Sequence, residues 1–177
     1  MKIRKKFFVF LIIFFMLFSN ISFASEPNIA SSAAILVESS TGKILYEKNA
    51  YEKMYPASTT KVMTAILTLE NCDLNEMATV SHNAIYSLPV GYVNANLQEG
   101  EQISVKDLMY ALMVKSANDA AIVLAEHIGG SVENFANMMN TKAKQLGCKN
   151  THFVNPNGIH NENHYSTAYD LYLIASY

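Results

Sequence analysis

The sequence contains 177 residues, half of them hydrophobic, and carries 13 basic against 15 acidic side chains. A chain of this length can form one domain with a sizeable core. The chain has a slightly negative net charge and no excess of basic residues. Because nucleic-acid binding depends on such an excess, we do not expect nucleic acid as a partner.

The first 24 residues have the pattern of a signal peptide. A basic start, Lys2 to Lys6, precedes an unbroken apolar run from Phe7 to Phe18, and small residues stand at Ser22 and Ala24. The run is short for a membrane span, which needs about 20 apolar residues. We expect cleavage after Ala24 and export to the cell envelope. The remaining chain has nine basic residues, none of them arginine, against fifteen acidic ones.

Residues 33–38 and 43–47 are predicted to form two strands, because short apolar runs flank a turn that contains Gly42. The turn holds Ser40 and Lys43, which have the Ser-x-x-Lys spacing of a nucleophile and its base. A turn does not stack residues i and i+3 as a helix does, so we expect no site there.

A helix is predicted from Ser58 to Glu70. Pro56 suits the approach to a helix, and neither glycine nor proline interrupts the following three or so turns. Beyond Lys61 apolar side chains occupy nearly the whole circumference, which indicates a helix that is buried on most sides. Ser58 and Lys61 therefore share one face of the polar first turn, within reach of each other.

Ser58 and Lys61 are candidates for a catalytic pair. A serine hydroxyl needs a base, and a lysine can serve as one only when its pKa is lowered by burial or nearby positive charge. A buried helix N-terminus supplies both effects. The motif is short, however, and chance alone also produces it.

The middle of the chain is less regular. Residues 78–100 contain short extended pieces and turns, and include a second serine triplet, Ser81-His82-Asn83. Three helices then follow with short links, as a helical subdomain does. We predict them at residues 104–115, 120–128 and 132–146.

Ser116 and Asn118 lie at the junction between the first two of these helices. There, a serine could relay a proton to a leaving amine, and an asparagine amide could hold both a lysine and a substrate peptide group. The alternative is structural: Ser116 as a helix cap and Asn118 as a turn residue.

A metal site and a cofactor are not expected. His160 and His164 lie near Glu162 and Asp170, but in an Asn-rich loop where spacing fixes no third ligand. Asn157-Gly158 is interpreted as a turn rather than a site.

Cys72 and Cys148 are the two cysteines. Export permits a disulfide between them, and packing as two free thiols is an equal alternative.

Together, the motifs resemble those of penicillin-binding proteins and serine β-lactamases. Four runs narrow the resemblance to the D-alanyl-D-alanine carboxypeptidases of low molecular mass: 55–61, 116–121, 150–158 and 165–171. The resemblance implies an α/β (α+β) fold, β-lactamase/transpeptidase-like, in which an antiparallel sheet flanked by helices lies beside a mostly helical subdomain. The active site is expected between the two.

Carried over by position, the resemblance makes Ser58 the acylated nucleophile and Lys61 its base. It makes Ser116 a proton relay and Asn118 a substrate clamp. The implied substrates are peptidoglycan stem peptides, and β-lactam antibiotics are the implied inhibitors. Full-length family members are expected to associate with the membrane surface.

The sequence also departs from the family pattern. The third family motif, Lys-Thr-Gly, is absent, and the chain stops inside a helix predicted to begin near Thr167. We therefore expect 25–177 to be a partial catalytic domain, incomplete at the C-terminus. Two alternatives stay open: a serine β-lactamase of the same fold, and an inactive truncated fragment. Glu133 does not have the context of a β-lactamase's hydrolytic glutamate, which argues against the first.

Overall fold

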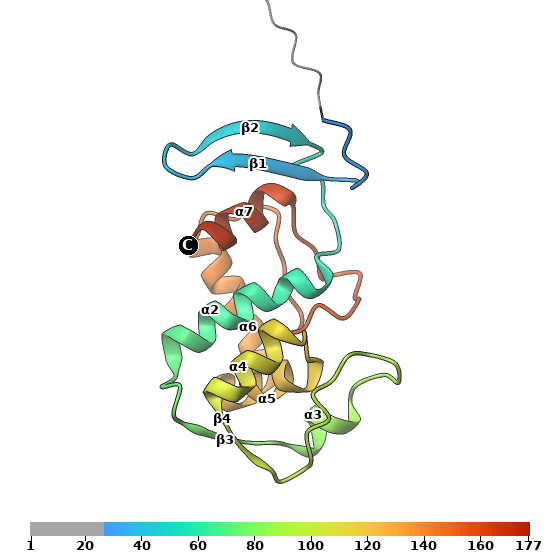
Figure 1. Ribbon diagram of the computed structural model, residues 1–177, viewed down its shortest axis with the longest axis vertical. Helices are drawn as coiled ribbons and strands as arrows, with labels where there is room; N and C mark the ends of the chain where they lie inside the picture. Colours follow the sequence, from blue (N-terminus) through green and yellow to red (C-terminus); the bar gives the residue numbers. More distant parts are fainter. Residues whose placement is uncertain (1–26) are drawn as a thin grey trace, which may run out of the picture. The chain divides into compact units, whose positions relative to one another are not determined.

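A computed structural model describes residues 27–177 (Figure 1). The chain divides into a unit Met1–Ala30 and a unit Ser31–Tyr177, and every helix and strand named below belongs to the second. The predicted signal peptide, 1–24, lies outside the described residues. Among residues 27–177, helices long and apolar enough to cross a membrane do not occur.

The predicted hairpin is present. Strands β1 (Ala34–Glu38) and β2 (Lys43–Lys48) pair antiparallel, and α7 (Ala168–Ser176) packs against β1 (Figure 1). The turn between the strands is held by the Glu38 carboxylate, which accepts from the backbone N–H and the hydroxyl of Ser40. Ser40 is thus a turn residue, in agreement with the prediction that its Ser-x-x-Lys spacing is not a site.

The predicted Ser58 helix is present, but its first turn is not α-helical. Residues Ala57–Thr60 form a 3₁₀ helix, η1, and the α-helix α2 begins only at Lys61 and ends at Asn71. Ala57, just before Ser58, has a φ of +48°, a left-handed conformation in which the chain changes direction before it enters the helix. The chain therefore enters α2 through a tighter turn, which the Thr59 N–H closes by donating to the Pro56 carbonyl at 3.2 Å.

The helical subdomain follows the predicted order. It contains α4 (Val105–Val114), α5 (Asn118–Gly129) and α6 (Val132–Gln145). The Ser104 and Ser131 hydroxyls cap α4 and α6, each accepting a backbone N–H from the residue three positions on. Two short strands, β3 (Met77–Thr79) and β4 (Gln102–Ser104), pair antiparallel beside these helices, with α3 (His82–Tyr86) between them in sequence.

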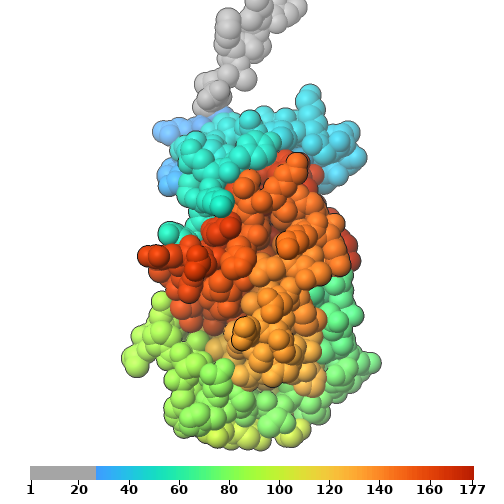
Figure 2. Space-filling view, turned by 180° about the vertical axis from the view of Figure 1, so that it is seen from behind, coloured from blue at the N-terminus to red at the C-terminus, as the bar shows by residue number. Residues whose placement is uncertain are grey.

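Two apolar clusters form the core. One surrounds α5 and includes Leu108, Val123 and Leu124; the other lies between α2, α6 and α7 and includes Phe135 and Phe153. Each such side chain contributes about 1.5–3 kcal/mol when fully buried. The clusters fix α2 and α5 against each other, and these are the two helices that carry the candidate site. Figure 2 shows α6 and the segment after it, in orange, across the middle of the opposite face of the unit.

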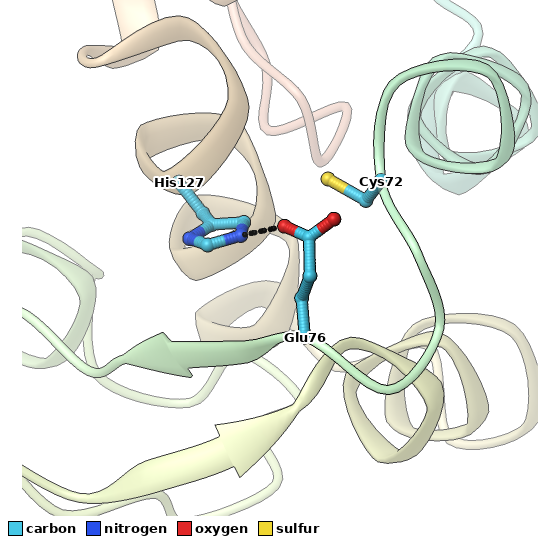
Figure 3. A group of neighbouring side chains, drawn as sticks. All are labelled: Cys72, Glu76 and His127. Carbon is cyan, nitrogen blue, oxygen red and sulfur yellow. Dashed lines mark hydrogen bonds and ion pairs between the residues drawn. The ribbon is translucent and has the colours of Figure 1, made fainter.

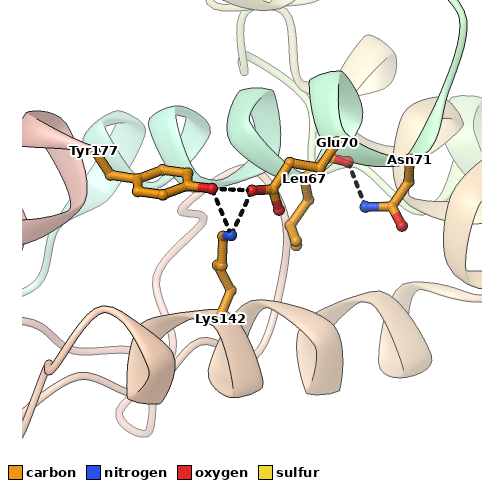
Figure 4. A network of polar contacts seen from close by, with 5 residues as sticks. All are labelled: Leu67, Glu70, Asn71, Lys142 and Tyr177. Carbon is orange, nitrogen blue, oxygen red and sulfur yellow. Dashed lines mark hydrogen bonds and ion pairs between the residues drawn. The ribbon is translucent and has the colours of Figure 1, made fainter.

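A polar network joins α2, α6 and the residue after α7 at the surface (Figure 4). Lys142 Nζ forms an ion pair with Glu70 and donates to Tyr177 Oη at 3.2 Å. Tyr177 Oη in turn donates to Glu70 Oε1 at 2.5 Å. An exposed ion pair contributes about 0–1 kcal/mol, so the apolar core, rather than this network, holds the three helices together.

Candidate active site

A cavity of about 340 Å³ opens beside η1 and the start of α5. Three of the four predicted site residues line it: Ser58, Ser116 and Asn118. The fourth, Lys61, is buried beneath with 3% of its surface exposed. The other lining residues are Ala57, Gly91, Tyr92, Val93, Asn157, Gly158, Ile159 and His160.

Lys61 lies at the centre of the site. Its Nζ is 3.2 Å from Ser58 Oγ, 3.0 Å from Asn118 Oδ1 and 2.8 Å from the carbonyl oxygen of Asn157. Burial lowers the pKa of Lys61 from 10.5 to about 8. The structure thus brings a hydroxyl into contact with an amine that loses its proton more easily than a solvated lysine does.

Ser58 and Lys61 differ in exposure. Ser58, in η1, is exposed to solvent, whereas Lys61, at the first position of α2, is buried. A substrate can therefore approach the hydroxyl from the cavity without contacting the amine. This is the arrangement in which a buried base activates an accessible nucleophile.

Asn118 begins α5 and faces α2. Its side-chain N–H donates to the Val93 carbonyl at 2.9 Å, and its Oδ1 accepts from Lys61. Ser116 lines the same cavity with a left-handed backbone, φ +59°, which is rare for a residue other than glycine. In the described part of the chain, no hydrogen bond joins the Ser116 hydroxyl to Ser58 or Lys61.

Asn157 is a site contact that the sequence analysis interpreted only as part of a turn. Its carbonyl accepts from Lys61, and the preceding carbonyl, of Pro156, accepts from the Thr64 hydroxyl at 2.6 Å. Gly158 allows this approach because a Cβ there would lie 1.8 Å from the Ala57 carbonyl oxygen. The resemblance of 150–158 to the carboxypeptidases was the signal for this segment; residue types alone gave none.

His164 contacts Thr60, the last residue of the η1 turn that carries Ser58. It is buried, its Nδ1 accepts from the Val154 N–H at 3.2 Å, and its Nε2 lies 2.8 Å from the hydroxyl of Thr60. Burial, reinforced by His152, lowers the pKa of His164 from 6.5 to about 4. The ring is therefore neutral at pH 7, with Nε2 donating to Thr60.

His160 and Asp170, which the sequence analysis considered as metal ligands, make different contacts in the structure. The Asp170 carboxylate accepts hydrogen bonds from the backbone N–H groups of Lys149 and Asn150. The His160 ring packs edge-on against the Tyr55 ring, with 4.5 Å between the ring centroids. Glu133 lies in the first turn of α6 and outside the cavity lining.

The two cysteines are free thiols. Burial and the nearby Asp170 raise the pKa of Cys148 to about 11, and burial with Glu76 raises that of Cys72. The structure thus contains no link between Cys72 and Cys148.

Comparison with known proteins gives a consistent result. The family model described as D-alanyl-D-alanine carboxypeptidase matches residues 20–177. D-alanyl-D-alanine carboxypeptidase DacF of Bacillus subtilis is 41% identical over 153 residues, covering 85% of this chain and 39% of the relative. D-alanyl-D-alanine carboxypeptidase DacC of Escherichia coli is 37% identical over 174 residues, covering 91% of this chain and 44% of the relative. This chain thus spans less than half of the length of these relatives.

Solved structures agree on the fold. The D-alanyl-D-alanine carboxypeptidase DacD from Francisella tularensis superposes with a TM-score of 0.82 at 36% identity, covering 89% of this chain and 39% of that one. Penicillin-binding protein 5 from Haemophilus influenzae superposes with a TM-score of 0.81 at 34% sequence identity. The match covers 87% of this chain and 46% of that one. The predicted fold class, mixed α/β of the penicillin-binding protein type, is confirmed. The chain belongs to the D-alanyl-D-alanine carboxypeptidase family of peptidases.

Proposed function

We propose that this chain supplies the nucleophile and the base of a serine D-alanyl-D-alanine carboxypeptidase, which removes the terminal D-alanine from peptidoglycan pentapeptide stems. The contact of 3.2 Å between Lys61 Nζ and Ser58 Oγ, with the amine buried, carries the proposal. Family membership supports the substrate class.

The three partners of Lys61 specify how the base would act. A neutral amine has two N–H groups and one lone pair, and two carbonyl-type oxygens, Asn118 Oδ1 and Asn157 O, accept the two N–H groups. The lone pair is then directed at Ser58 Oγ. With a pKa of about 8, roughly a tenth of the amine is neutral at pH 7.

The reaction then takes two steps. Ser58 Oγ attacks the carbonyl carbon of the scissile peptide bond while its proton passes to Lys61. As the C–N bond breaks, Lys61 returns this proton to the leaving nitrogen through the Ser116 hydroxyl, which lines the same cavity and would move into contact when substrate binds. D-alanine leaves, and an ester on Ser58 remains. Water hydrolyses this ester and restores the hydroxyl.

A β-lactam would acylate the same oxygen and leave a long-lived ester, because Glu133 does not line the cavity.

We further propose that residues 1–24 direct export and that 25–177 is part of the catalytic domain. The basic start and apolar run support export to the cell envelope. Association of the full-length protein with the membrane surface rests on resemblance to longer family members.

Labelling with a fluorescent penicillin tests the proposal. The complete product of the gene is compared with Ser58→Ala and with Ser40→Ala, a matched control because Ser40 also precedes a lysine by three positions. We expect label on the first and third proteins and none on Ser58→Ala. Equal labelling of Ser58→Ala would remove Ser58 from its role, and rapid turnover of nitrocefin would favour a β-lactamase instead. Release of D-alanine from a pentapeptide measures the carboxypeptidase directly.

A further inference from the structure

Three side chains of metal-binding type meet where α2 and α5 end and β3 begins (Figure 3). Cys72 caps the C-terminus of α2, Glu76 immediately precedes β3, and His127 lies in the last turn of α5. Their ligand atoms all lie within 4.8 Å of one another, and Glu76 Oε2 is 3.1 Å from His127 Nε2. Among residues 27–177, the three constitute the one group of this kind.

We propose that Cys72, Glu76 and His127 bind a zinc ion, with water as the fourth ligand. Thiolate, imidazole and carboxylate are all zinc ligands, with metal–ligand distances of about 2.0–2.3 Å in a tetrahedral arrangement. This geometry places ligand atoms about 3.3–3.8 Å apart. The three side chains have room to rotate toward this geometry, because the Glu76 and His127 side chains are 45% and 25% exposed and Cys72 is only partly buried.

The electrostatic surroundings favour a cation. Helices α2 and α5 both end at this point, and the carbonyl groups of a helix C-terminus carry partial negative charge. The Glu76 carboxylate is already oriented toward the site, because the backbone N–H of Asp73 donates to Oε1 at 2.7 Å and His127 Nε2 lies 3.1 Å from Oε2. The Cys72 thiol would release its proton when the metal binds.

The position of the proposed ion, at the C-terminal ends of α2 and α5, points to an effect on the packing of these two helices. Helices α2 and α5 begin with Lys61 and Asn118, whose side chains meet at 3.0 Å in the candidate active site. The ion would join the opposite ends of the same two helices. It would therefore stabilise the helix pair that sets the separation of Lys61 and Asn118.

The sequence alone does not reveal this group. Cys72 and Glu76 are four positions apart, but His127 follows Glu76 by 51 positions. The sequence analysis expected no metal, and the tertiary structure leads us to depart from that expectation.

Metal titration of the purified, chelator-treated protein tests the proposal. Cobalt replaces zinc in such sites and reports a thiolate ligand through a charge-transfer band in the near ultraviolet. Four variants are compared: Cys72→Ser and His127→Gln in the site, and Cys148→Ser and His82→Gln as controls. His82 serves as a control because it pairs with Glu99 at 3.0 Å, as His127 does with Glu76 at 3.1 Å, but belongs to no group of three metal-binding side chains among residues 27–177.

We expect one ion per chain and the cobalt band in the wild type and in both controls. Cys72→Ser should lose the band, and zinc should bind about 100-fold more weakly to both site variants. Zinc at 100 times its Kd should raise the Tm of the wild type by about 5–10 °C. Absence of the band in the wild type, or equal zinc affinity of Cys72→Ser and the wild type, would overturn the proposal whether or not a variant folds.

Discussion

The amine of Lys61 lies 3.0 Å from the side-chain oxygen of Asn118, although 57 positions separate the two residues in sequence. Both side chains are almost fully buried. The contact joins the first residue of α2 to the first residue of α5, so the relative position of two helices decides how the amine is oriented.

Substitution Asn118→Ala should therefore impair both acylation and stability. Lys61 loses an acceptor and the Val93 carbonyl loses a donor, so we expect acylation of Ser58 by penicillin to slow about 100-fold. The free energy of unfolding should fall by about 1–3 kcal/mol. Labelling rates and urea unfolding measure the two effects. Asn83→Ala, which removes an exposed amide that donates to Glu126, should leave labelling unchanged.

Acylation should depend on pH through Lys61. The reactive form is the neutral amine, and burial lowers the pKa to about 8. The rate should therefore rise about tenfold per pH unit below pH 8 and level off above it. Penicillin labelling rates between pH 6 and 10 check this profile. A rate independent of pH over that range would contradict the assignment of Lys61 as the base.

His164 should make stability depend on acid pH. Its pKa is about 4 in the folded state against 6.5 when unperturbed, so between these values the unfolded chain binds a proton that the folded chain does not. The free energy of unfolding must therefore fall as the pH falls from 6.5 to 4, by up to about 3 kcal/mol.

Urea unfolding at pH 7 and 4.5 measures this dependence. His164→Gln should show a smaller loss of stability between the two pH values than the wild type does. His82→Gln, at an exposed position, should follow the wild type. An unchanged loss in His164→Gln would show that other groups cause the acid sensitivity.

Gly158→Ala should be far more damaging than Gly100→Ala. The two glycines have nearly equal φ, +82° and +81°, so the backbone strain of an alanine is matched at about 1–2 kcal/mol. A Cβ at Gly158 would overlap the Ala57 carbonyl, whereas one at Gly100 meets no atom within 4 Å.

The overlap should add about 1–3 kcal/mol of destabilisation at Gly158 and move the Asn157 carbonyl away from Lys61. We therefore expect slow acylation in Gly158→Ala and wild-type rates in Gly100→Ala. Thermal unfolding and penicillin labelling measure the two effects, and equal Tm values for the two variants would argue against the close approach.

The sequence predicted those parts of the site that depend on local spacing. Ser58 and Lys61 are three positions apart, so even a change from α-helix to 3₁₀ helix at Ser58 kept them in contact. Helices α4 and α6 were predictable because Ser104 and Ser131 cap them, and the glycines at 129–130 mark the end of α5. The start of α5, which has no side-chain cap, lies two residues before the predicted position. The five-residue helix α3 was missed, since its capping Ser81 begins a triplet that was considered only as a possible motif.

Contacts made by backbone atoms could not be predicted in this way. Asn157 contributes its carbonyl oxygen, which every residue has, and it meets Lys61 across 96 positions. The cluster of Cys72, Glu76 and His127 could not be predicted for a different reason: its side chains come from distant parts of the sequence and meet only when α2 packs against α5.

The partners of Lys61 have a consequence for newly made protein. Ser58 and Lys61 leave the ribosome first, whereas the carbonyl of Asn157, needed to orient the amine, is synthesised 96 positions later. On the proposed mechanism, the nascent chain therefore lacks an oriented base until Asn157 has been synthesised and packed against α2. Under the proposed role of Ser58, a penicillin bound there would mark only molecules in which the segment around Asn157 has packed against α2, and would thereby count that fraction of a mixed population.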